Sequence, residues 1–139
     1  RRQILSSNWK GMDLIPKIKS PSEDMEQAWL IKWFRRQYPA VRIFAIPNGG
    51  HRRLSVAVKL KATGVSPGVP DLQVPAWNLW VEMKRSDGVP SDVRANQREW
   101  IEYLKGVGHT VIIGYGWEDA QRKISEFDKK NPAPGRVQG

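Results

Sequence analysis

Two acids and a lysine stand close together in the segment GVPDLQVPAWNLWVEMKR. The β-branched and aromatic residues on either side of PAWN predict two strands joined by a turn. A hairpin centred between Ala76 and Trp77 puts Asp71 directly opposite Glu82, on the same face of the sheet. Lys84, two residues beyond Glu82, shares that face. The register therefore predicts a cluster of two carboxylates and one amine.

Such a cluster has the ligands for metal-assisted hydrolysis of a phosphodiester. Neighbouring carboxylates repel each other unless a cation joins them. Oxygen ligands in a chain without cysteine favour Mg²⁺ or Mn²⁺ over zinc, and the backbone carbonyl near Met83 adds a further oxygen. The ion would polarise a phosphoryl oxygen and acidify a bound water, while Lys84 orients that water or stabilises the pentacoordinate phosphate. The alternative is an exposed hairpin whose charges form ordinary surface ion pairs.

The first predicted helix supplies a third acid. It is expected to start at the cap Ser20, with Glu23 three residues later as in a capping box. Glu26 falls on the apolar stripe of this helix, four and eight residues before Leu30 and Phe34. An acid on an apolar face is unusual, so Glu26 is a candidate metal ligand or water-holding group. The alternative is a residue at the edge of the stripe that reaches solvent.

A second helix supplies a polar group that faces inward. It is predicted between the cap Ser91 and the terminator Gly106. Gln97 lies on its apolar face, beside Trp100 and Ile101. A polar group turned toward a core needs a partner, and the metal site would provide one. Gln97 is therefore predicted to position the site; a polar residue at the stripe edge is again the alternative.

The remaining elements alternate between strands and helices. Residues 41–46 and 109–115 are typical of strands, and residues 117–127 of a helix. Residues 52–64 are ambiguous, because their valines suit a strand whereas their spacing suits a helix, which we favour. This order predicts an α/β or α+β sheet with helices packed on it.

Composition narrows the class of protein. The chain has 139 residues, which suits a single domain with a modest core. Its net charge of +9 and pI near 10.1 favour a nucleic acid or another polyanion as partner, although a charge spread for solubility is the alternative. No apolar run approaches the ~20 residues of a membrane span, and no secretory signal follows the basic start. We expect an intracellular protein with no membrane partner.

Residues outside the hairpin offer contacts to DNA phosphates. Asn48 and the glycines after it allow the backbone to approach a phosphate, and Arg52 and Arg53 follow them. A solvated turn is the alternative. Lys61 would extend this basic surface if its segment is a helix.

Most of the tryptophans are expected to lie in the core rather than to stack on bases. This core set comprises Trp29, Trp33, Trp80 and Trp100. Trp77, in the hairpin turn, is the candidate for a DNA contact.

Several motifs in the same order resemble the virus-type replication-repair nuclease (VRR-NUC) domain of the PD-(D/E)xK superfamily. They cover about residues 22–120 and are EDMEQAWL, PNGGHR, LKATGVSPGVPDL, WVEMKR and NQREWIEYLKGVGHTVIIGY. The resemblance implies five active-site residues: Glu26, Asp71, Glu82, Lys84 and Gln97. It also implies a metal site for Mg²⁺ or Mn²⁺ made by Asp71, Glu82, the Met83 carbonyl and Glu26.

The same resemblance implies the fold, the substrate and the assembly. The fold would be a restriction-endonuclease-like α/β core, with a mixed central sheet flanked by helices. A nuclease domain over 20–130 would lie between an N-terminal arm, 1–19, and a flexible tail, 131–139. Small stand-alone members are typically phage proteins, active in the bacterial cytoplasm, that often act as homodimers on branched DNA such as Holliday junctions. The alternatives are a non-catalytic DNA-binding protein, or a nuclease of the same type that acts on linear DNA ends or RNA.

Overall fold

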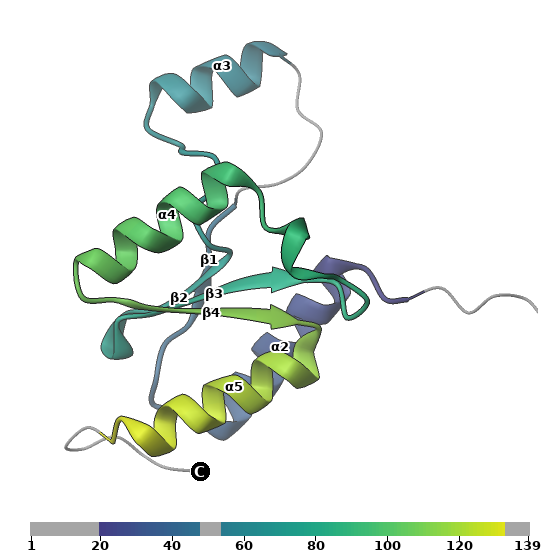
Figure 1. Cartoon of the computed structure of the whole chain (residues 1–139), viewed down its shortest axis with the longest axis vertical. Coiled ribbons are helices and arrows are strands. Elements are labelled where there is room, and N and C mark those ends of the chain that lie inside the picture. Colours follow the sequence, from purple (N-terminus) through teal and green to yellow (C-terminus); the bar gives the residue numbers. More distant parts are fainter. Residues whose placement is uncertain (1–19, 48–53, 133–139) are drawn as a thin grey trace, which may run out of the picture.

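The protein folds around a four-stranded sheet with helices on both faces (Figure 1). The structure, a computed structural model, describes residues 20–47 and 54–132. The predicted N-terminal arm, most of the C-terminal tail, and the loop residues Asn48, Arg52 and Arg53 lie outside this part of the chain. Within it, no helix is long and apolar enough to cross a bilayer.

The hairpin that carries the predicted cluster has the predicted register. Strands β2 (Leu72–Val74) and β3 (Leu79–Lys84) pair antiparallel, with Leu72 opposite Val81. A 3₁₀ turn over Pro75–Trp77 joins them, and Asn78 completes the turn in the left-handed region at φ 48°. The predicted core face is confirmed, since four side chains are buried: Leu72, Val74, Val81 and Met83.

The two outer strands make the sheet mixed, as the fold class predicted. Strand β1 (Phe44–Ala45) pairs antiparallel with β2 and is shorter than the predicted strand over 41–46. Strand β4 (Thr110–Tyr115) pairs parallel with β3. Parallel strands end at the same edge of a sheet, so Lys84 and Tyr115 lie side by side there.

Helices α2 (Glu23–Gln37) and α5 (Trp117–Lys130) cover the apolar face of the sheet. The cap of α2 is Ser22, not the predicted Ser20, because the Ser22 Oγ accepts the hydrogen bond from the Met25 amide at 3.2 Å. The main core fills the space between the two helices and the sheet. Its largest buried members are Leu30, Phe34, Leu72, Leu79, Met83 and Ile124.

Helix α4 (Ala95–Gly106) packs on the opposite face of the sheet. Its cap is Arg94 rather than the predicted Ser91, which lies in a separate 3₁₀ turn over Pro90–Asp92. The chain is extended at Val93 between the two, so a single helix from residue 91 does not form. The predicted inward orientation of Gln97 is confirmed, because its side chain is buried.

Helix α3 (Leu54–Ala62) confirms the helical interpretation for most of the described part of residues 52–64 and stands apart from the rest of the molecule (Figure 1). Two of the tryptophan predictions are wrong. Trp77 is only 8% exposed and packs against Phe34 and Tyr38, which leaves it no access to DNA. Trp29, expected in the core, is 40% exposed.

Candidate active site

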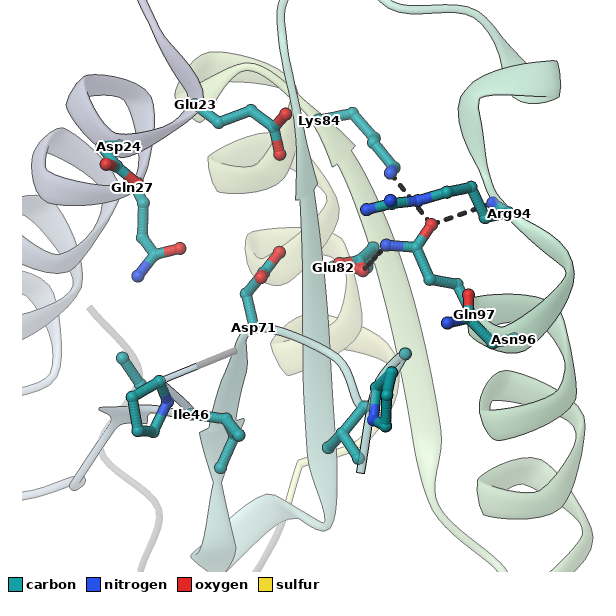
Figure 2. A pocket seen from close by; sticks show the side chains of 15 residues that line it. Glu23, Asp24, Gln27, Ile46, Asp71, Glu82, Lys84, Arg94, Asn96 and Gln97 are labelled. Carbon is teal, nitrogen blue, oxygen red and sulfur yellow. Dashed lines mark hydrogen bonds between the residues drawn. The ribbon is translucent and has the colours of Figure 1, made fainter. Parts of the chain in front are cut away.

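A polar pocket of about 570 Å³ lies where the ends of β2 and β3 meet the N-terminal turns of α2 and α4 (Figure 2). Its charged and amide side chains come from α2, from the residue before β2, from β3, and from α4 with its cap. These are Glu23, Asp24, Gln27, Asp71, Glu82, Lys84, Arg94, Asn96 and Gln97. The pocket therefore contains four of the five predicted active-site residues.

Asp71 sits one residue before β2 and is fixed by the backbone on both sides. Its carbonyl accepts a hydrogen bond from the Ile46 amide at 2.7 Å, which extends the pairing between β1 and β2. Its Oδ2 accepts a hydrogen bond from the Met83 amide, also at 2.7 Å. Since Met83 follows Glu82 on β3, this bond holds the Asp71 carboxylate beside that residue.

Glu82 is a buried acid beside another acid. Its side chain is 2% exposed, and it shares a hydrogen bond with the Asp71 carboxyl. Burial, together with this close carboxylate, raises the pKa of Glu82 to about 9, although the nearby Lys84 ammonium acts in the opposite direction. Such a pair is stable with a shared proton or with a bound cation, and not as two bare anions.

Gln97 links the amine to the acids. Its Oε1 accepts a hydrogen bond from the Lys84 Nζ at 3.0 Å, and its Nε2 donates to the Glu82 Oε2 at 3.3 Å (Figure 2). The same Oε1 accepts from the Arg94 amide at 2.9 Å, which caps α4. One side chain thus starts the helix and fixes the positions of Lys84 and Glu82.

A glycine allows α4 to come this close to the loop before β2. Gly68 has a positive φ of 93°, a region that side-chain-bearing residues rarely adopt. A Cβ at Gly68 would lie 2.7 Å from the carbonyl group of Asn96. Any larger residue would push the first turn of α4, and with it Gln97, away from the acids.

Glu26 does not line this pocket, which corrects the prediction that it is a metal ligand or holds water. Its side chain is 4% exposed, and its Oε2 accepts a hydrogen bond from the Trp117 amide at 3.0 Å. Trp117 is the first residue of α5, so Glu26 satisfies a free N–H group at the helix start. Gly116, at φ 85°, makes room for this carboxylate, because a Cβ there would collide with it. The unusual burial of Glu26 has a structural cause.

Two acids of α2, Glu23 and Asp24, line the pocket, and Glu23 was predicted only as part of a helix cap. Partial burial and the negative charge of Asp71 raise the pKa of Glu23, while Lys84 and Arg94 lower it. Gln27 follows one turn later and also lines the pocket. The spacing of four, three and four residues puts Glu23, Gln27, Leu30 and Phe34 on one side of α2. This spacing is the signal that could have predicted Glu23 at the pocket, because the same side of the helix continues into the core.

Arg94 and Asn96 are the other pocket residues that the sequence did not single out. Arg94 also lines a neighbouring groove of about 450 Å³, together with Arg85 and Asp92. Glu23, Lys84 and Arg94 line both cavities, so pocket and groove are continuous. Cations along this path suit the phosphates of a nucleic acid strand that crosses the site.

The donor set of the pocket fits a hard divalent ion. Carboxylate oxygens are the ligands that Mg²⁺ and Mn²⁺ prefer, and the Asp71–Glu82 pair offers them side by side. Across residues 20–47 and 54–132, no three acids or histidines already converge on one point as a metal site. The fit thus rests on this pair, with Glu23 nearby; the Met83 carbonyl stays a prediction.

Lys61 lies on the exposed α3, outside the pocket. Its predicted role in DNA binding, like that of Asn48, Arg52 and Arg53, stays a prediction.

A mixed sheet flanked by helices, with an acid pair and a lysine at one edge, defines a restriction-endonuclease-like α/β fold. A solved structure described as "VRR_NUC domain protein" is similar to this chain. It has a TM-score of 0.66 and 26% sequence identity, over 81% of this chain and 92% of that chain. The fold is therefore VRR-NUC-like, in agreement with the resemblance of the motifs. Neither a protein-family model nor a curated protein matches the sequence.

Proposed function

We propose that this protein is a metal-dependent DNA endonuclease whose active site is the pocket around Asp71 and Glu82. The observation that carries the proposal is the contact between the buried carboxylate of Glu82 and the half-buried carboxylate of Asp71, with Gln97 linking Glu82 to the Lys84 amine. Burying like charges together opposes folding unless something binds between them. A protein that only binds DNA has no use for this pair, whereas phosphodiester hydrolysis does.

Five residues of the pocket have a role in this proposal. Asp71 and Glu82 would hold Mg²⁺ or Mn²⁺, and Asp71 is already oriented for it by the Met83 amide. When bound, the ion would polarise the phosphate and acidify a water molecule. Lys84, held by Gln97, would orient the attacking water or stabilise negative charge on the phosphate. Glu23 faces the same space and would hold water or complete the ligands.

The substrate part of the proposal is DNA, preferably branched DNA such as a Holliday junction. The similarity to a VRR_NUC domain protein and the net charge of +9 support a nucleic acid substrate. A four-way junction presents two symmetric strands, which suits a homodimer with one pocket for each cut. We include in the proposal that the chain is phage-encoded and acts in the cytoplasm of a bacterial host.

A panel of labelled substrates tests the proposal directly. Four-way junction, flap, duplex, single strand and RNA are incubated with Mg²⁺, Mn²⁺ or EDTA, and the products are mapped on a sequencing gel. We expect metal-dependent cuts, with the highest rate on the branched substrates. Light scattering of the free protein and of the junction complex measures the predicted dimer.

Each rival function gives a different outcome in this panel. Binding with steep salt dependence and no product with any metal would indicate the non-catalytic DNA-binding protein. Products from linear ends or from RNA, with junctions left intact, would keep the chemistry and replace the substrate. The variant Lys105→Gln, which removes an exposed cation far along α4, serves as the control for loss of charge alone.

A further inference from the structure

A second groove, of about 450 Å³, lies between the outer sides of α2 and α5 and is separate from the acidic pocket. It is lined by Trp29, Lys32, Trp33, Arg36 and Trp117. None of these lining residues is an acid. Three indoles and two cations thus meet on one small surface, which we call the tryptophan groove.

The helices hold the tryptophan groove in a fixed form. On α2, Trp29, Trp33 and Arg36 are spaced four and three residues apart, so they lie on one side of the helix. Trp117 is the first residue of α5, where its amide is held by Glu26. Trp33 and Trp117 each pack one side against the core and remain half-buried. These indoles are therefore ordered before anything binds.

We propose that the tryptophan groove binds an unpaired nucleic acid strand. Indole faces stack on bases of any sequence, and Lys32 and Arg36 at the same surface would contact the phosphates. A duplex hides the faces of its bases, so it has nothing to stack here. The alternative occupant is a second copy of this chain, which the oligomeric state of the Trp29 variant tests below.

The position of the groove relates it to the acidic pocket. Helix α2 starts at the pocket with Glu23, and at 1.5 Å per residue Trp29 lies about 9 Å further along the axis, with Arg36 at about 20 Å. Six residues also turn Trp29 about 120° around the helix axis from Glu23, so a strand that leaves the pocket reaches Trp29 only after it bends around α2. This inference rests on the proposed function. If the protein is a nuclease, the groove predicts that its substrates carry a single strand next to the cut.

Binding measurements in EDTA test the groove without any cleavage. The affinities for a labelled 20-nucleotide strand and for a blunt duplex of the same length are measured by fluorescence anisotropy. We expect Trp29→Ala to weaken binding of the single strand roughly tenfold, the usual loss for one base–aromatic stack, and to leave duplex binding within twofold. Trp29→Phe should restore most of the affinity, because it keeps a ring.

Matched variants separate stacking and phosphate contacts from general effects. Tyr103→Ala removes an aromatic side chain that is 61% exposed on α4, and it should leave both affinities unchanged. Lys32→Gln with Arg36→Gln should lower the salt dependence of single-strand binding by about 1.4 in log–log slope. Lys129→Gln with Lys130→Gln removes the same charge from the far end of α5 and should not lower it.

Three results would overturn the inference. Trp29→Ala could bind the single strand as tightly as the wild type, or Tyr103→Ala could lose as much affinity. Light scattering could also show a wild-type dimer that becomes a monomer in Trp29→Ala, which would make the groove an interface between two copies. Failure of the proposed function is a separate result: wild type that cuts nothing with any metal, but binds single strands through Trp29, refutes the nuclease and keeps the groove.

Discussion

Two buried glutamates, one on each side of the sheet, have opposite surroundings. Glu26 is 4% exposed and Glu82 is 2% exposed, so neither reaches bulk water. Glu26 accepts a hydrogen bond from the Trp117 amide, at a helix start where the helix dipole favours negative charge. Glu82 lies against the carboxyl of Asp71, and burial together with this contact raises the pKa of Glu82.

This difference teaches which buried acid marks a site. A buried acid on an apolar face indicates that its carboxylate has a partner. Burial alone does not say whether that partner is a group of the protein or a bound ligand. For Glu26 the partner is a backbone amide, so the residue is complete and stabilises the junction of α2 and α5. For Glu82 the neighbour is a second acid, and in the proposed function a bound cation balances the two charges. Functional and structural acids separate by what they contact.

The largest expected effect is a loss of cleavage, which only substitutions in the acidic pocket should cause. Lys84→Met should lower the cleavage rate by roughly 10²–10³-fold, the usual loss for one charge-stabilising group, and Glu82→Gln by at least as much. Glu26→Gln should retain cleavage within about tenfold of the wild type. Single-turnover rates with saturating enzyme measure this. Equal losses in Glu26→Gln and Glu82→Gln would erase the distinction between the two glutamates.

A smaller loss of activity is expected at Glu23, an acid of α2 that lines the pocket. Glu23→Gln should slow cleavage by on the order of tenfold, the usual effect of a group that orients a metal ligand or its water. Asp24→Asn is the matched control, since Asp24 is the next residue and also lines the pocket. If Asp24→Asn is the more damaging change, the charge of the pocket matters more than the position of Glu23.

The stability of the two glutamine variants should change in opposite directions. Because its pKa is raised to about 9, Glu82 takes up a proton when the metal-free protein folds at neutral pH, and this uptake costs stability. Glu82→Gln needs no proton and still offers Asp71 an N–H donor, so it should stabilise the metal-free protein by about 1 kcal/mol. Glu26→Gln puts donor hydrogens into a buried site that presents an amide N–H, and should destabilise it by about 1–2 kcal/mol. Urea unfolding in EDTA measures both. Two changes of the same sign would contradict the assignment.

The sequence predicted the fold and most of the pocket because those features follow from local rules. Alternation and a four-residue turn set the register of the hairpin, which placed Asp71, Glu82 and Lys84 on one face. The apolar stripe of α4 predicted that Gln97 faces inward. Each of these inferences needs only the period of one element.

The failures have the opposite character, because they depend on contacts between elements distant in sequence. The partner of Glu26 lies 91 residues away, at the start of α5, and no pattern within α2 reveals it. Trp77 is buried because the rings of Tyr38 and Phe127 pack against it. The cap was predicted at Ser20, which gave Glu23 a role in the capping box. The cap is in fact Ser22, so Glu23 is the first residue of α2 and is free to line the pocket. The period of a helix predicts which side chains share a face, whereas the partners of those side chains are set by packing against distant elements.

The last comparison of the two glutamates uses metal binding in the absence of DNA. Free Mn²⁺ at ten times its Kd should stabilise the wild type by about 1.4 kcal/mol, which raises Tm by about 4 °C for a domain of this size. Glu82→Gln should lose this shift, because it removes one of the two facing carboxylates. Glu26→Gln should unfold at a lower temperature and still show the full shift, since its carboxylate is committed to the Trp117 amide. A shift retained in Glu82→Gln would place the ion elsewhere, and a shift lost in Glu26→Gln would connect that residue to the metal after all.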